Sequence, residues 1–292
     1  MKFATALRLG RISNLPTVWT NVLAGAVLAA GVSSAVDHRV PILLVALSLF
    51  YVGGMFLNDA FDSEFDAKVR PDRPIPSGQV TARQVFTYGF VLIGLGLTLL
   101  GWVGVGFEPT TGWRPVAAGV ALAAAIVFYN WHHKGNALSP VVMGLCRMLV
   151  YLCAAFSLQS VLPNRVYVAA LVLLCYLIGL TYAAKQEHLA RIGSVWPLAF
   201  LAVPLVFGIY LSLEQKAGWL PLLAFALCTM FAVRLLLRRQ RGDVPRGVVS
   251  LIAGISLLDA VFLASQGAVW PSVVAVACFA LTLLMQAWVT GT

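Results

Sequence analysis

The sequence predicts an all-helical protein that crosses a membrane many times. Hydrophobic residues make up 60% of the 292-residue chain, charged residues make up only 11%, and the mean hydropathy is +0.89. Apolar runs of about 20 residues recur along the chain, and each is long enough to span a bilayer. This composition excludes a soluble globular protein.

Ten apolar windows can be separated, and together they predict one transmembrane domain over residues 1–292. They cover, in order, residues of about 15–32, 40–60, 83–105, 115–131, 137–159, 165–185, 194–213, 218–237, 247–265 and 269–289. For the first window the alternative is a cleaved signal peptide, with a cut near Ala29. Because this run is long and is interrupted by Asn14 and Asn21, an uncleaved first helix is favoured.

The basic residues are distributed unequally between the two sides of the predicted membrane. Fifteen fall on one side: Lys2, Arg8, Arg11, Lys68, Arg70, Arg73, Arg83, Lys134, Lys185, Arg191, Arg234, Arg238, Arg239, Arg241 and Arg246. Four fall on the other side: Arg39, Arg114, Arg165 and Lys216. By the positive-inside rule, both termini and the Asp-rich segment described below should face the cytoplasm, in the inner (plasma) membrane of a bacterium. The net charge of +9 is thereby explained without a nucleic-acid partner, and no obligate protein partner is expected.

The five cysteines give no sign of a metal or disulfide site. Each lies within an apolar window: Cys146, Cys153, Cys175, Cys228 and Cys278. Because no CxxC pair or His-Cys cluster occurs, they are expected to be small packing residues.

Carboxylates are concentrated in the segment from Asn58 to Gly78. Of the eleven in the chain, five fall here: Asp59, Asp62, Glu64, Asp66 and Asp72. If one helix continues through Asp66, then Asn58, Asp62 and Asp66 share a face, because residues four apart drift only about 40° per step. Asp59 joins this face from the other side. Such a row of hard oxygen ligands suits Mg²⁺. The alternative is a solvated acidic helix end, paired with nearby Lys and Arg side chains.

The connection after this segment cannot be one continuous helix. Pro71, Pro74 and Pro76 remove backbone donors and fix φ. The run Thr81–Gln84 fits a capping box, so the next helix should start at Thr81. The connection could therefore act as a structured cap over a cytoplasmic mouth.

Two charged residues, Arg147 and Asp259, lie far from the ends of predicted spans, where a charge usually faces a cavity or a partner. Arg147 could bind a phosphate bidentately or form an ion pair with an Asp of the acidic segment. Asp259, deep in the ninth window, could pair with any cation nearby. At the end of the fourth window, Lys134 follows His132 and His133. Because adjacent side chains diverge on a helix, these two histidines should not form a metal site. The alternative is that all three are ordinary residues of the membrane interface.

The pattern Asn-Asp-x-x-Asp-x-x-x-Asp from Asn58 to Asp66 ends the second predicted helix and is followed by the basic, Pro-rich loop Arg70–Gly78. This block resembles the first motif of the UbiA family of intramembrane prenyltransferases. The resemblance implies a UbiA-like bundle of nine to ten transmembrane helices around a central cavity, nine being usual in the family. It also implies Mg²⁺-dependent transfer of a prenyl group from an allylic prenyl diphosphate to a lipophilic acceptor within the membrane. We expect this acceptor to be aromatic.

The resemblance assigns roles to particular residues. It implies that Asp62, Asp66 and Arg147 are catalytic. The implied metal ligands are Asn58, Asp59, Asp62, Asp66 and Glu187. The implied diphosphate ligands are Lys134, Arg147, Lys185, Arg73 and Arg191.

The second family motif, an Asp-rich run, should end the sixth helix. Here the run Thr181–Arg191 has one carboxylate, Glu187, together with the basic Lys185 and Arg191. We therefore expect one tightly bound Mg²⁺ on the first motif. Lys185 and Arg191 are expected to line the opposite wall of the diphosphate site.

Two other functions remain open from the sequence. A catalytically altered relative could bind or carry a prenylated or aromatic lipophile, with the acids kept for a structural cation. A cation transporter is disfavoured, because the acids cluster at one mouth and few lie deep in the membrane.

Overall fold

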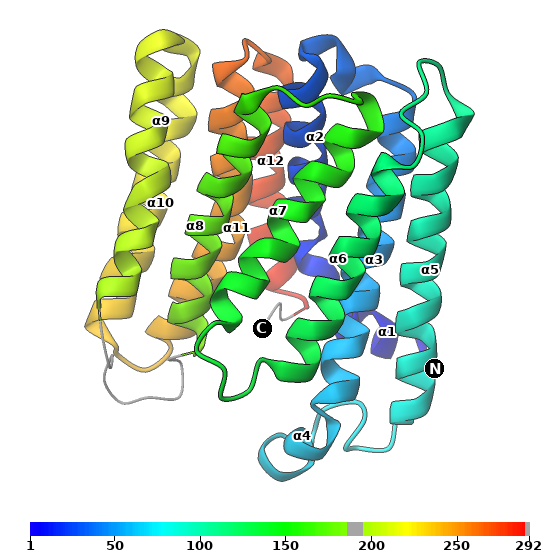
Figure 1. Ribbon diagram of the computed structural model, residues 1–292. Helices are drawn as coiled ribbons and strands as arrows, with labels where there is room; N and C mark the ends of the chain where they lie inside the picture. Colours follow the sequence, from blue (N-terminus) through cyan, green and yellow to red (C-terminus); the bar gives the residue numbers. More distant parts are fainter. Residues whose placement is uncertain (186–194, 290–292) are drawn as a thin grey trace.

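The structure is a computed structural model that describes residues 1–185 and 195–289. These residues form α-helices, short 3₁₀ helices and connecting turns, without a strand (Figure 1). The elements are α1 (Phe3–Leu9), η1 (Ile12–Asn14), α2 (Leu15–Ala30), η2 (Val32–Val36), α3 (Arg39–Phe61), α4 (Ser63–Val69), α5 (Ala82–Gly106), α6 (Arg114–His132), α7 (Ser139–Leu158), α8 (Asn164–Lys185), η3 (Trp196–Leu201), α9 (Ala202–Glu214), η4 (Lys216–Gly218), α10 (Trp219–Arg238), α11 (Asp243–Ser265) and α12 (Val269–Gln286).

The predicted all-helical membrane fold is confirmed. Within the described residues, 10 helices are long and apolar enough to cross a membrane, and each coincides with one predicted window. The seventh span differs in detail, since it begins with the 3₁₀ turn η3 before α9. Such an array makes the chain an integral, multi-pass membrane protein.

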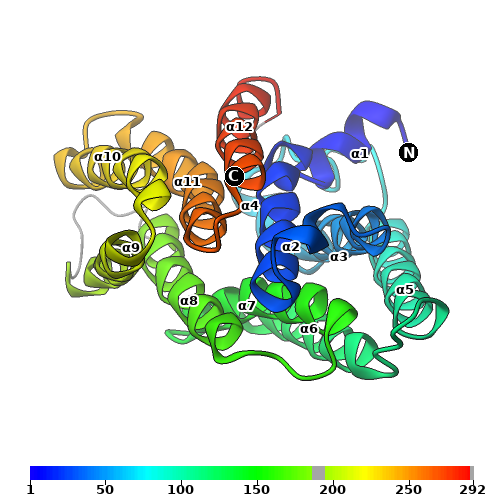
Figure 2. The ribbon, with the colours of Figure 1, turned by 90° about the horizontal axis from the view of Figure 1, so that it is seen from above.

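The spans form a bundle in which α2 and α7 lie near the centre (Figure 2). The buried apolar residues form two large clusters, and both include residues of α2 and α7. One cluster joins α2 and α7 to α3, α5 and α6, and the other joins them to α8, α10 and α11. In the spans of α2 and α11, 83% of residues are buried, against 28% in those of α6 and α12. The first two are therefore central, and the last two present most of their surface to lipid.

Local sequence signals explain several helix boundaries. The capping box predicted before α5 is confirmed, because Thr81 Oγ1 accepts from Gln84 N at 3.3 Å and Gln84 Oε1 accepts from Thr81 N at 3.2 Å. Helices α2, α6 and α7 each begin with a proline in the first turn, where its missing N–H costs nothing.

Small residues let α3 pack closely against α5. A Cβ added to Gly53 would lie 2.8 Å from the backbone oxygen of Gly89, so only glycine fits at this crossing. Because α3 leads directly into the acidic segment, the crossing fixes where that segment emerges from the bundle.

The two ends of the bundle differ in charge. The α4 segment, the α6–α7 connection and the α10–α11 connection lie at the same end, which is the lower end in Figure 1. Three of the four basic residues assigned to the other side, Arg39, Arg114 and Arg165, begin α3, α6 and α8 at the opposite end. The unequal distribution seen in the sequence is thus a real difference between the two ends.

Candidate active site

A cavity of about 460 Å³ opens into the bundle at the end where α4 lies. Its mouth is polar and is lined by Asn58, Asp62 and Asp66 together with Lys134 and Lys185. Deeper in the bundle its walls are apolar: Val18, Leu47, Phe50, Leu122, Ile126 and Val150. This arrangement suits a molecule with an anionic head and an apolar tail.

The acidic segment is not one continuous helix, which corrects the expectation from the sequence. Helix α3 ends at Phe61 and α4 begins at Ser63, with Asp62 between them at φ −85° and ψ −2°. The break is slight, because Asp62 N still donates to Asn58 O at 3.0 Å and Asp66 N to Asp62 O at 2.8 Å. The spacing of four residues is kept, so Asn58, Asp62 and Asp66 all line the cavity.

Three acids of this segment, Asp59, Asp62 and Asp66, are already held by cations. Asp59 Oδ1 lies 3.1 Å from Arg11 Nη2 and 3.3 Å from Arg73 Nη1. Asp66 Oδ2 lies 2.7 Å from Arg73 Nη1. Asp62 Oδ1 lies 2.7 Å from Lys134 Nζ, while its Oδ2 lies 3.6 Å from His133 Nε2. The acids and the cations that could bind phosphate therefore share one site.

Arg73 ties the Pro-rich connection to the acids. Its Nη1 reaches both Asp59 and Asp66, although it belongs to the turns that follow α4. Ile75 of the same connection packs against a small apolar cluster that contains Leu9 and Val85. The connection is thus anchored beside the mouth by both charge and apolar contact.

Arg11 was not identified as a site residue from the sequence. Its Nη2 donates to Asn58 Oδ1 and to Asp59 Oδ1, both at 3.1 Å, and its backbone is left-handed at φ 42°. A non-glycine residue in this region is uncommon and is often found at functional sites. No local pattern marks Arg11, because its partners lie 47 and 48 residues away.

Asn130 of α6 was also missed, and it fixes the first residue of the acidic segment. Asn130 Oδ1 accepts from Asn58 Nδ2 at 3.1 Å, and Asn130 Nδ2 donates to Gly54 O at 3.0 Å. The amide of Asn58 is therefore oriented with its oxygen toward Arg11.

The end of α6 places Lys134 and one histidine in the site. His133 faces Asp62, whereas His132 packs near Phe128 and Trp131, so the two rings diverge as expected. Lys134 Nζ also lies 4.0 Å from the centre of the Phe65 ring. One residue of the pair thus contributes to the site and the other does not.

Arg147, inside α7, lines the cavity but does not pair with the acidic segment. Its Nη1 donates to Asn21 Oδ1 at 2.9 Å, and its Nη2 donates to Thr17 Oγ1 at 3.0 Å. The guanidinium carbon lies 5.6 Å from the centre of the Tyr51 ring. Of the two possibilities left open by the sequence, the ion pair with a first-motif Asp is not formed.

Lys185, at the end of α8, is held by the α6–α7 connection. Its Nζ donates to Asn136 O at 2.8 Å and to Ser139 Oγ at 2.7 Å, with His133 O at 3.5 Å. It lines the same cavity as the acidic segment. The other two residues expected beside it, Glu187 and Arg191, lie outside the described residues.

The oxygen ligands at the mouth fit a hard divalent cation that is bound by only a few protein side chains. Among the described residues, no three His, Cys, Asp or Glu side chains converge on one point. A cation there would take one or two carboxylates and fill its coordination with water and substrate oxygens, which is the preference of Mg²⁺. Asn58, Asp59, Asp62 and Asp66 remain the predicted ligands.

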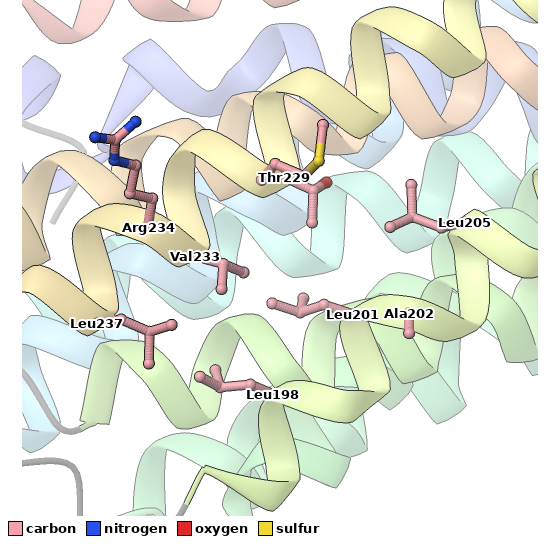
Figure 3. Close-up of a pocket in the computed structure, with 9 residues that line it drawn as sticks. Leu198, Leu201, Ala202, Leu205, Thr229, Val233, Arg234 and Leu237 are labelled. Atoms are coloured by element: carbon pink, nitrogen blue, oxygen red, sulfur yellow. The ribbon is translucent and has the colours of Figure 1, made fainter.

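A second hollow, of about 450 Å³, lies between η3, α9 and α10 (Figure 3). Leu198, Leu201 and Val233 line it, and Arg234 at its edge points away from the leucines. It has no carboxylate among its lining residues. It is therefore distinct in chemistry from the cavity at the acidic segment.

These features define a class of protein: an integral membrane bundle whose central cavity combines acids, Arg and Lys at one mouth with apolar walls. Residues 18–246 match the model of the UbiA prenyltransferase family, so the chain belongs to that family. The resemblance seen in the first motif is confirmed.

Relatives and solved structures agree with this assignment. The chain is 32% identical to the digeranylgeranylglyceryl phosphate synthase of Methanopyrus kandleri over 140 residues, which cover 47% of this chain and 46% of that protein. It is similar in fold to a solved digeranylgeranylglyceryl phosphate synthase, with a TM-score of 0.64, 18% identity and coverage of 91% and 98% of the two chains. It is also similar to the UbiA homologue of Archaeoglobus fulgidus bound to GPP and Mg²⁺, with a TM-score of 0.59, 13% identity and coverage of 88% and 99%. The chain thus spans less than half the length of the first of these relatives, and the two structures show the fold.

Proposed function

We propose that this protein transfers a prenyl group from an allylic prenyl diphosphate to a lipophilic acceptor within the membrane, with Mg²⁺ as cofactor. On this proposal residues 1–292 act as one transmembrane domain, and α12, which follows the matched family region, packs on α2 and η1. The observation that carries the proposal is the single cavity that holds Asp62, Asp66, Lys134 and Arg147 above apolar walls. The Archaeoglobus homologue, whose structure contains GPP and Mg²⁺, supports it.

The polar mouth would bind the diphosphate and the apolar walls would bind its hydrocarbon tail. Mg²⁺ held by Asn58, Asp62 and Asp66, with Asp59 in support, would neutralise charge that develops on the leaving diphosphate. Lys134 and Arg73 now pair with Asp62 and Asp66, so both stand where they can donate to phosphate oxygens. Positioned cations of this kind stabilise a leaving anion without reorganising during the reaction.

The cleavage leaves an allylic cation that must meet the acceptor before it meets water. The electron pair of the C–O bond leaves with the diphosphate, and the acceptor then forms the new bond to carbon and loses a proton. The connection that Arg73 ties to Asp59 and Asp66 would act as a cap over the mouth and limit the entry of water. We propose an aromatic acceptor. A prenylated glyceryl phosphate alcohol is the alternative acceptor to be tested beside it, because the relatives are named for a glyceryl phosphate product.

The test is release of pyrophosphate by the purified protein in detergent or nanodiscs. Prenyl diphosphates of several lengths would be supplied with Mg²⁺ and with either an aromatic or a prenylated glyceryl phosphate acceptor. The proposal predicts pyrophosphate and a prenylated product in equal amounts, both lost with EDTA. Saturable binding of a prenyl diphosphate without pyrophosphate release would instead indicate a carrier.

The charge difference between the bundle ends leads to a prediction of orientation. We propose that the end carrying Asp66, Lys134 and Arg241 faces the cytoplasm of a plasma membrane. Single cysteines at exposed positions 68 and 241 should be protected from an impermeant thiol reagent in intact cells, whereas one at position 113 should react. Labelling of position 68 from outside would contradict this orientation.

The wall opposite the acidic segment leads to a second prediction. If Lys185 helps to neutralise the diphosphate, Lys185→Ala should weaken its binding by about tenfold, as expected for one hydrogen bond to a charged group. Glu187→Gln should weaken it less. Titration of an unreactive prenyl thiolodiphosphate with Mg²⁺ would rank the two variants, and a larger loss in Glu187→Gln would assign Glu187 as a metal ligand.

A further inference from the structure

Asp259 of α11 is a carboxylate in the interior of the bundle. It is fully buried, and it does not line the cavity. A buried charge of this kind is costly unless it is paired or well hydrogen-bonded, and inside a membrane protein it usually has a function. Neither the metal nor the diphosphate site described above uses it.

In the described part of the chain the direct partners of Asp259 are three neutral side chains. Thr20 Oγ1 and Asn21 Nδ2, both on α2, donate to its Oδ2 at 2.5 and 2.8 Å. The hydroxyl of Tyr151, on α7, donates to its Oδ1. All three partners are fully buried. The carboxylate thus draws the two helices that join both halves of the bundle onto α11.

One of these partners connects Asp259 to the cavity. Asn21 donates to Asp259 through Nδ2 and accepts from Arg147 Nη1, at 2.9 Å, through Oδ1. Because a carboxylate only accepts hydrogen bonds, it requires the NH₂ group of Asn21 to face it, and this turns the amide oxygen toward Arg147. Asp259 and Arg147 are therefore linked through the amide of Asn21.

This bridge fixes one edge of the guanidinium and leaves the rest for a ligand. Arg147 uses Nη1 on Asn21 and Nη2 on Thr17, whose own hydroxyl donates to Asn14 O at 2.7 Å. An arginine has five N–H donors, so three remain, on a residue that lines the cavity. The buried negative charge compensates the guanidinium from behind without occupying the donors in front.

We propose that Asp259 is a positioning residue that acts through Asn21 to hold Arg147 at the cavity wall, ready to bind the anionic head of the substrate. The proposal rests on the proposed function, in which Arg147 binds diphosphate. Asp259 is not a general base here, because it lies behind Asn21 and Tyr151 and does not contact the cavity.

A double-mutant cycle separates this role from simple support of the fold. Asp259→Asn removes the charge; its amide oxygen can still accept from Thr20 and Asn21, so this variant tests the charge behind Arg147, while its NH₂ group replaces the oxygen that accepts from Tyr151. Asn21→Leu removes the bridge but leaves Asp259 bonded to Thr20 and Tyr151. Each variant would be made with Arg147 intact and with Arg147→Met. The readouts are the thermal midpoint and the Kd of a prenyl thiolodiphosphate measured with Mg²⁺.

We expect each variant to raise the Kd about tenfold when Arg147 is present, by analogy with residues that orient a ligating side chain. Neither variant should raise it further in Arg147→Met. The matched control is Tyr176→Phe, which loses another buried hydrogen bond to α11, the one to Leu251 O at 2.8 Å, and should lower only the thermal midpoint.

Failure of the positioning role of Asp259 and failure of the diphosphate role of Arg147 would give different results. If Asp259→Asn and Asn21→Leu leave the Kd unchanged, or raise it equally with and without Arg147, Asp259 does not act through Arg147 and the positioning role is overturned. If Arg147→Met itself leaves the Kd unchanged, the diphosphate role of Arg147 is overturned, and the positioning role with it. Should Asp259→Asn not fold, Asp259→Glu takes its place in the same cycle, because it keeps the charge but moves the carboxylate relative to Asn21; an unchanged Kd in that variant would overturn the positioning role.

Discussion

Asp62→Asn is expected to weaken Mg²⁺-dependent binding of a prenyl diphosphate by about a hundredfold or more. The substitution keeps the shape of the side chain and removes its charge at the centre of the acidic segment, where Asp62 lines the cavity. Loss of one partner from a desolvated charged site costs about 3–5 kcal/mol, which corresponds to a factor of roughly 10² to 10³ or more.

The folded structure should tolerate this change. Asp62 pairs with Lys134, whose side chain is 41% exposed, so the freed ammonium can be solvated at little cost. Glu64→Gln is the matched control, because it makes the same chemical change on an exposed residue of α4 outside the cavity. Equal thiolodiphosphate affinities for Asp62→Asn and wild type would show that the acidic segment is not the diphosphate site.

Arg147→Met should have the second largest effect. Truncating one charge of a buried, hydrogen-bonded contact costs about 2–5 kcal/mol, so the Kd for the diphosphate and the value of kcat/KM should change by at least about thirtyfold. Arg147→Lys keeps the charge without the planar fork and should recover part of the loss, because a lysine is a point charge.

The same titration as for Asp62→Asn would measure both Arg147 variants. Methionine fills the space of the aliphatic stem, so a well-folded variant with weak binding is the expected outcome. Wild-type affinity in Arg147→Met would mean that its bonds to Asn21 and Thr17 serve the bundle alone.

The spans and their boundaries could be predicted because they depend on local properties. The length of each apolar window decides whether it can cross a bilayer, and Thr81 with Gln84 encodes a helix start within four residues. Asp62, Asp66 and Lys134 were predicted as site residues because they cluster at helix ends, and the structure brings all three to one cavity.

The contacts that sequence reasoning missed are long-range. Arg11 meets Asn58 across 47 residues, and Asn130 meets it across 72. For Asp259 the sequence left any nearby cation open as a partner, and its direct partners are Thr20, Asn21 and Tyr151. Which donors surround a buried carboxylate depends on how α2, α7 and α11 pack, and no spacing within one helix carries that information. The break of the helix at Asp62 was missed as well, because its backbone bonds remain helical on both sides.

The most direct test of the central claim is a structure of the protein with Mn²⁺ and a prenyl thiolodiphosphate. The account predicts a strong anomalous peak between Asp62 or Asp66 and the diphosphate, with Lys134 and Arg147 donating to its oxygens and the tail along Phe50 and Leu122. It predicts no second metal peak near residue 187. A second peak there would replace the one-metal arrangement by a two-metal one. A diphosphate bound away from the acidic segment, without a metal at Asp62 or Asp66, would contradict the account.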